Sequence, residues 1–168
     1  MIWFVSPLLG EAFLYGLFAV QIGIIMNFEE RLQIQEVIAR FANSFDVKDW
    51  DGLQACFTES LYTDYSDLRG TPPETLAASE YVRLRRESLD HLKLQHLVSN
   101  YEIDFTGSDT AACRASMVVW RAADGEEFTS HCFYTFQLVK QNGGWRINGI
   151  TQKVLWNEGK ASLHTVSN

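Results

Sequence analysis

AACRASMVVWRAADGEEFTSHCFYTFQLVKQNGGWRINGITQKVLW, residues 111–156, decides the fold of this chain. The stretch holds three strand-like segments, and Asp124-Gly125 and Asn142-Gly143-Gly144 separate them. Such Asp-Gly and Asn-Gly pairs favour the tight turns of β-hairpins. None of the three segments contains a proline, as interior strands require. We therefore predict consecutive strands over 111–121, 128–139 and 145–156.

Another strand-like segment, 95–105, precedes this stretch and ends at Gly107-Ser108-Asp109, which has the composition of a turn. The chain before it has helical patterns. Apolar residues recur at spacings of three and four over 28–47, and Asp49 is placed to cap a short helix over 50–57. We also expect a short strand over 61–65, a loop at Gly70-Thr71-Pro72-Pro73 and a helix over 74–92.

Helices followed by a run of hairpin-linked strands are typical of an α+β fold, with helices on one face of an antiparallel sheet. We predict a cone-shaped α+β barrel in which the N-terminal helices pack on a strongly curved antiparallel sheet. A cone of this kind has one deep, mostly apolar pocket at its open end.

A length of 168 residues is that of about one domain. Residues 1–25 form an apolar N-terminal extension with one charge, Glu11. We consider four alternatives for this extension: a signal peptide, a membrane anchor, a packed helix, or a start codon assigned too early. We favour the last, with translation from Met26. We assign residues 26–157 to the domain and 158–168 to a polar tail, and we do not expect a membrane protein.

The charge and the cysteines exclude several classes of function. The formal net charge is −7, and the longest basic run is 83–86, so we expect no nucleic-acid partner. The three cysteines, Cys56, Cys113 and Cys132, are far apart, which favours buried thiols in a reducing, cytoplasmic setting. The chain lacks phosphate-binding, nucleophile-elbow and zinc motifs, so we predict no cofactor and no metal.

Asp46 is the first candidate for chemistry. It lies on the last turn of the predicted first helix, one residue after Phe45, and its neighbours on that face are apolar. The helix can therefore aim the carboxylate inward, where a carboxylate needs a partner. Alternatively, Asp46 is solvated or caps the helix junction with Asp49 and Asp51.

His96 is the second candidate, because the two-residue period of a strand places it on one face with Leu94 and Val98. It is either a catalytic imidazole or a core histidine with satisfied hydrogen bonds. His131 raises the same question. Tyr65 ends the short strand, where its hydroxyl can donate to a substrate carbonyl or lie in water at a rim.

Several segments together resemble the SnoaL-like, nuclear-transport-factor-2-like superfamily, and scytalone dehydratase-like proteins in particular. The segments are FANSFDVKDWDGL (41–53), YTDY (62–65), Gln95-His96 and Gly144-Trp145-Arg146-Ile147. The resemblance spans residues 28–156. It implies that the predicted cone is cystatin-like and that the chain forms a homodimer or a homotrimer.

The resemblance also implies roles for the candidate residues. Asp46 would orient His96, His96 would be the general base and acid, and Tyr65 would polarise the substrate carbonyl. The implied function is that of a small-molecule lyase or isomerase, dehydratase-like, acting on an apolar hydroxy-carbonyl compound. We expect further substrate contacts from a set of aromatic and imidazole side chains: Phe45, Tyr62, Trp120, His131 and Phe133.

Two departures from the family pattern bear on the substrate. Phe45 stands where the family enzyme has a tyrosine, and no histidine falls near 119–121. His131 is a candidate to compensate, and a substrate other than scytalone is expected. The alternatives to an enzyme are a non-catalytic binding protein for an apolar ligand and a purely structural interaction protein, since the superfamily hosts many functions.

Overall fold

The computed structural model describes the backbone of residues 7–163 and the side chains of residues 27–163. The alternatives for residues 1–25, and the end of the predicted tail at 164–168, concern residues that lie wholly or partly outside this description. In the described part of the chain, no helix is both long enough and apolar enough to cross a bilayer.

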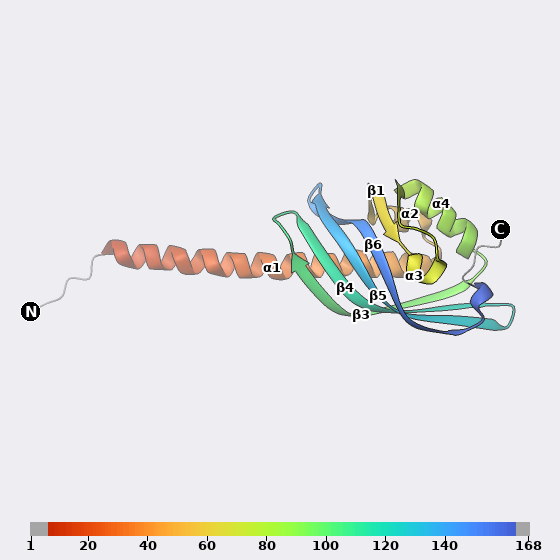
Figure 1. Ribbon diagram of the computed structural model, residues 1–168. Coiled ribbons are helices and arrows are strands. Elements are labelled where there is room, and N and C mark those ends of the chain that lie inside the picture. The colour runs from red at the N-terminus through yellow and green to blue at the C-terminus, as the bar shows by residue number, and fades with distance from the viewer. Residues whose placement is uncertain (1–6, 164–168) are drawn as a thin grey trace, which may run out of the picture. The chain divides into compact units, whose positions relative to one another are not determined.

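Figure 1 shows the elements in chain order. They are α1 (Pro7–Val47), α2 (Trp50–Gln54), β1 (Phe57–Asp64), α3 (Ser66–Arg69), β2 (Glu74–Ala77), α4 (Ala78–Leu89), β3 (Lys93–Phe105), β4 (Thr110–Ala123), β5 (Glu126–Gln141), β6 (Gly144–Gly159) and the 3-10 helix η1 (Ala161–Leu163).

The chain divides into two compact units, residues 1–33 and residues 34–168, and the boundary falls within α1. In the first unit, Arg31 Nε donates to Asn27 Oδ1 at 2.9 Å, across one turn of the helix. The second unit contains the rest of α1 and the strands β1 to β6. The candidate site lies entirely within this second unit.

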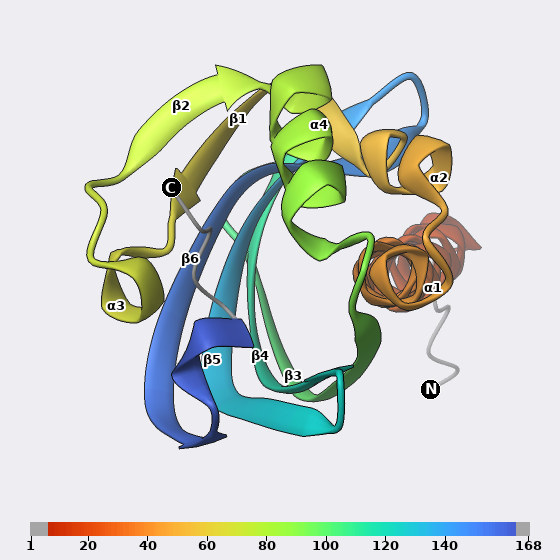
Figure 2. The same cartoon turned by 90° about the vertical axis from the view of Figure 1, so that its right-hand side faces the viewer.

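The six strands form one sheet in the order β2-β1-β6-β5-β4-β3. In Figure 2, β6, β5, β4 and β3 form a curved wall with α4 and the end of α1 on its concave side. This confirms the predicted α+β fold with a curved sheet. The β4–β5 and β5–β6 turns follow the sequence signals, since Asp124, Gly125, Asn142 and Gly143 have φ of 53°, 79°, 53° and 77°. Positive φ at both central residues gives the turn that matches strand twist.

The sheet differs from the prediction at β1 and β2. β1 pairs with β6 in parallel, so the sheet is not wholly antiparallel; no hairpin joins these two strands to impose an antiparallel direction. Residues 74–77, expected to be helical, form β2 and pair with β1, and the helix starts at Ala78. The predicted tail begins inside β6, where Glu158 and Gly159 pair with β5.

Bulges contribute to the curvature of the sheet. The β3–β4 register shifts between Ser99 and Glu102, where Asn100 has a φ of 55°. The β5–β6 register shifts after His131 and again after Gln137. Each extra residue bends its strand and increases the local twist. The sheet can therefore wrap around the helices on its concave side.

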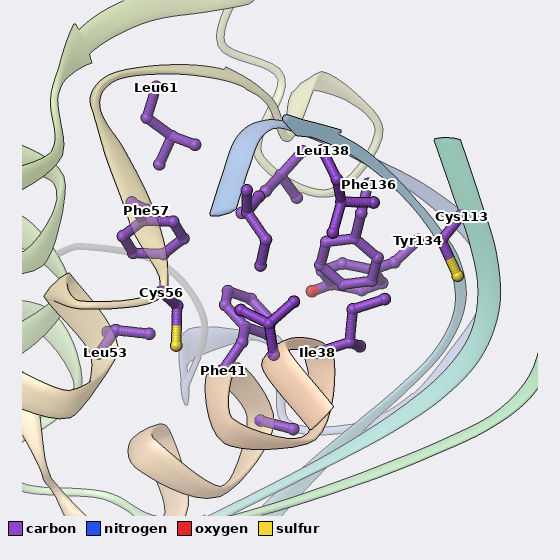
Figure 3. Packing of buried hydrophobic residues seen from close by; sticks show 14 of the residues in the cluster. Ile38, Phe41, Leu53, Cys56, Phe57, Leu61, Cys113, Tyr134, Phe136 and Leu138 are labelled. Atoms are coloured by element: carbon purple, nitrogen blue, oxygen red, sulfur yellow. The ribbon is translucent and has the colours of Figure 1, made fainter. Parts of the chain in front are cut away.

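The core fills the concave side of the sheet. Phe41 of α1 packs edge-on against Phe57 of β1 and Phe136 of β5, with ring centroids 6.0 and 5.4 Å apart. Figure 3 shows these rings together with Ile38 and Tyr134. Along β4 and β5, alternate residues face this core and are buried: Cys113, Ala115, Met117, Val119, Cys132, Tyr134, Phe136 and Leu138.

The three cysteines are buried and free, as the sequence predicts. Burial raises the pKa of Cys56 and Cys132 to about 11 and that of Cys113 to about 12. These thiols are therefore protonated at neutral pH and pack as small apolar groups.

Phe136→Ala tests the assignment of the inner face. The Phe136 side chain is fully buried, so its removal leaves a cavity and should lower the free energy of unfolding by about 3–5 kcal/mol. Phe133→Ala, on the outer face of the same strand, should cost about 1 kcal/mol or less. Urea denaturation measures both, and similar losses for the two variants would contradict the assignment.

Candidate functional site

The junction between α1 and α2 fixes the position of Asp46. α1 ends at Val47, where Lys48 has a φ of 62°, and Asp49 caps α2 by accepting from the Gly52 amide at 2.9 Å. Lys48 Nζ then donates to the Leu89 carbonyl at 2.8 Å. Since Leu89 ends α4, the junction is held against the end of that helix. Asp46, just before the junction, is directed at the sheet.

Asp46 makes two hydrogen bonds to His96, which lies on the edge strand β3. The His96 amide donates to Asp46 Oδ2 at 2.9 Å, and His96 Nδ1 lies 2.6 Å from Asp46 Oδ1. A carboxylate only accepts, so Nδ1 carries the proton. Nε2 of the neutral imidazole then holds a free lone pair, as a general base requires.

Apolar contacts hold the imidazole in this orientation. The Phe45 ring stacks on His96 with ring centroids 5.3 Å apart, and the His96 side chain is 8% exposed. Burial lowers the pKa of His96 below its ordinary value of 6.5, and nearby Arg121 and Lys48 act in the same direction. Asp46 opposes them and raises this pKa. His96 is therefore neutral at pH 7.

A pocket of about 470 Å³, including its mouth, opens beside His96. Its lining combines four apolar side chains with imidazole, phenol, guanidinium and amide groups. The lining residues are Phe41, Phe45, Tyr65, Leu68, Arg69, Tyr81, Arg85, Leu89, His96, Arg121, Tyr134 and Gln152.

Three tyrosines, Tyr65, Tyr81 and Tyr134, line this pocket. The hydroxyls of Tyr65 and Tyr81 lie 2.8 Å apart, and Tyr134 accepts from Gln152 Nε2 at 2.9 Å. Burial raises the pKa of each of these tyrosines. All three are protonated at neutral pH. Because Tyr134 already accepts a bond, its own proton is available to a ligand.

Sequence reasoning missed Arg121 and Tyr134. Arg121 is 8% exposed and shares the inner face of β4 with Met117 and Val119. Its Nη1 donates to Ser130 Oγ at 3.0 Å. Alternation along the strands was the available signal, since Tyr134 likewise shares a face with Phe136.

Among the expected substrate contacts, Phe45 lines the pocket and the other four do not. Tyr62, Trp120, His131 and Phe133 alternate with buried residues and so lie on the outer face of the sheet. Trp120 is 39% exposed, and His131 stacks on Trp156 with ring centroids 4.2 Å apart. The period of two places these four side chains on the wrong face for the pocket.

Among the described residues, no group of three or more histidine, cysteine, aspartate or glutamate side chains is arranged to hold a metal ion.

Comparison with known proteins identifies the family. The SnoaL-like domain matches residues 26–151. The chain belongs to the SnoaL-like family. This confirms the resemblance seen in the sequence. A relative of this SnoaL-like chain is the scytalone dehydratase-like protein claB of Passalora fulva, 26% identical over 145 residues, which cover 78% of this chain and 88% of the relative.

Solved structures agree with this fold. Kfla4162 from Kribbella flavida superposes on the SnoaL-like chain with a TM-score of 0.76 at 25% identity, covering 82% of this chain and 97% of that one. A Nostoc punctiforme protein described as having a cystatin-like fold gives a TM-score of 0.60 at 23% identity, covering 74% of this chain and 90% of that one. The predicted cystatin-like class is confirmed.

The protonation of His96 in this SnoaL-like domain is testable by NMR titration of its ring. We expect a pKa below 6.5, and a further decrease in Asp46→Asn, because the carboxylate raises this pKa. Folded His96 binds a proton more weakly than the unfolded chain does, so His96 reduces stability as the pH falls through 6.5 and on through the folded pKa. A wild-type pKa above 6.5 would contradict this balance of burial and charge.

Proposed function

We propose that this SnoaL-like protein is a cofactor-independent lyase that eliminates water from a hydroxy-carbonyl compound with a largely apolar body. One observation supports this most strongly. Asp46 Oδ1 lies 2.6 Å from Nδ1 of His96, and His96 lines a pocket that is also lined by three protonated tyrosines. A carboxylate-oriented imidazole beside hydroxyl donors suits the removal of a proton α to a carbonyl.

In the proposed first step, His96 Nε2 removes the proton on the carbon next to the carbonyl. The C–H electron pair forms the enolate C=C bond, and the carbonyl π pair moves onto oxygen. Tyr65 and Tyr134 donate hydrogen bonds to that oxygen, whose negative charge grows in the transition state. Asp46 stabilises the imidazolium that forms on His96.

In the second step, the enolate expels the hydroxyl group from the β carbon. The imidazolium returns its proton to this leaving group, so that water departs and His96 is neutral again. The product is an α,β-unsaturated carbonyl compound. Returning the proton to carbon instead would make the same pair an isomerase, which is why the family relation alone does not separate the two reactions.

The lining of the pocket supports this class of substrate. Phe41, Phe45, Leu68 and Leu89 offer apolar contacts to the body of the molecule. Tyr134 supplies a second hydroxyl in a chain that has Phe45 where family enzymes have tyrosine. The relative named as scytalone dehydratase-like favours a dehydration over other eliminations.

His96→Ala and Asp46→Asn test the proposal on a panel of β-hydroxy ketones, with water loss followed by the absorbance of the conjugated product. Removing the general base should lower kcat/KM by about 10²–10⁴-fold. The amide oxygen introduced by Asp46→Asn can still accept from the His96 backbone, so the fold is retained while the charge that stabilises the imidazolium is lost. Asp46→Asn should therefore lower kcat as well.

The matched control is His91→Ala, since His91 is an exposed histidine in the turn before β3. It should keep wild-type kcat/KM. Turnover that survives both His96→Ala and Asp46→Asn would refute the assignment of this pair.

A further inference from the structure

The pocket concentrates positive charge in an acidic protein. Arg69, Arg85 and Arg121 all line it, and no aspartate or glutamate is among its described lining residues. The whole chain has a formal net charge of −7. None of these three arginines has a carboxylate partner among the ion pairs of the described side chains. Three guanidinium groups therefore line this pocket with no carboxylate beside them in its lining, while Arg69 and Arg85 also line a second pocket that includes Glu74.

Arg85 is the clearest case. It projects from the buried face of α4 and is 8% exposed. Within the described part of the chain, its Nε and Nη1 are buried and have no hydrogen-bond acceptor. A buried charged group without partners is costly, and such groups are rare in native proteins. The described part of the chain therefore supplies no acceptor for these two nitrogens, and a bound ligand is the remaining source of one.

Arg69 repeats this arrangement from α3. Its Nε is also buried without an acceptor in the described residues. The Arg69 and Arg85 guanidinium carbons lie 5.1 and 5.9 Å from the centroid of the same ring, that of Tyr65. Both guanidinium groups thus lie against the proposed carbonyl-binding tyrosine.

We propose that Arg85, with Arg69, forms a subsite for a carboxylate carried by the substrate. The inference rests on the proposed function for the identity of the reacting group, and it narrows the substrate to a hydroxy-carbonyl acid. A carboxylate accepts charge-assisted hydrogen bonds from guanidinium groups and supplies the missing countercharge. The Phe41, Phe45, Leu68 and Leu89 side chains favour an organic acid over a small inorganic anion.

The position of the subsite gives it a function in the reaction. Arg85 lies on α4 and His96 on β3, and both line the same pocket. A substrate whose carboxylate is bound at Arg85 has one orientation in the pocket. In that orientation its carbonyl lies at Tyr65 and its acidic proton at His96, and the reversed orientation is excluded. Productive orientation of this kind contributes to catalysis without contact with the reacting atoms.

The experiment is calorimetric titration of the full chain with benzoate and with benzamide, which have similar shape and differ in charge. Wild type should bind benzoate about tenfold or more tightly than benzamide. Arg85→Gln should abolish the preference, and Arg85→Lys should keep part of it. Arg86→Gln is the control, because it removes the same charge from an exposed position of α4.

His96→Ala separates this inference from the proposed function. It should retain the wild-type preference for benzoate, since the subsite does not need the general base. Equal affinity for benzoate and benzamide in wild type would overturn the subsite, as would an undiminished preference in folded Arg85→Gln. Tighter binding of inorganic phosphate than of benzoate would overturn the assignment to a carboxylate. None of these outcomes depends on turnover.

Discussion

The contact between Asp46 and His96 joins the end of α1 to the sheet at the wall of the candidate site. β3 is the edge of the sheet, so one row of its backbone groups has no neighbouring strand. Asp46 Oδ2 accepts a hydrogen bond from one of those amides, that of His96, and Asp46 Oδ1 accepts one from the imidazole. A single carboxylate thus joins the end of α1 to the sheet and sets the tautomer of the histidine.

Much of the fold follows from local signals in the sequence. Asp124-Gly125 and Asn142-Gly143 adopt the turn that their composition favours, and these two turns fix the antiparallel strands β4, β5 and β6. The parallel pairing of β1 with β6 depends instead on a contact between residues some 90 positions apart in the chain. No local pattern encodes such a contact, and Glu74–Ala77 becomes a strand only because β1 offers it an edge.

The candidate site was predictable to a smaller degree. Asp46 and His96 stand out because a polar side chain interrupts an apolar face. Along β5, both faces carry aromatic residues, so Phe133 and His131 were as plausible as Tyr134. Burial of Arg121 and Arg85 runs against the general rule that charged side chains stay in water. Strand alternation indicates the inner face of β4 for Arg121, whereas the position of Arg85 in the pocket follows only from the packing of α4 against the curved sheet.

The same packing sets the protonation state of His96. Desolvation and Arg121 lower its pKa, while Asp46 raises it, so the imidazole is neutral and yet well oriented. The lining of this pocket thus combines the polar groups of arginines and tyrosines with the apolar side chains of phenylalanines and leucines.

The buried cysteines have a consequence of another kind. Cys113 and Cys132 lie on adjacent strands in the middle of the sheet, and Cys56 lies between α2 and β1. Alkylating reagents attack thiolates, so these sulfurs react only when the strands and helices around them separate. The rate of their modification therefore reports how often the interior becomes open to solvent. The three cysteines thus serve as intrinsic probes of this opening, and no label has to be added.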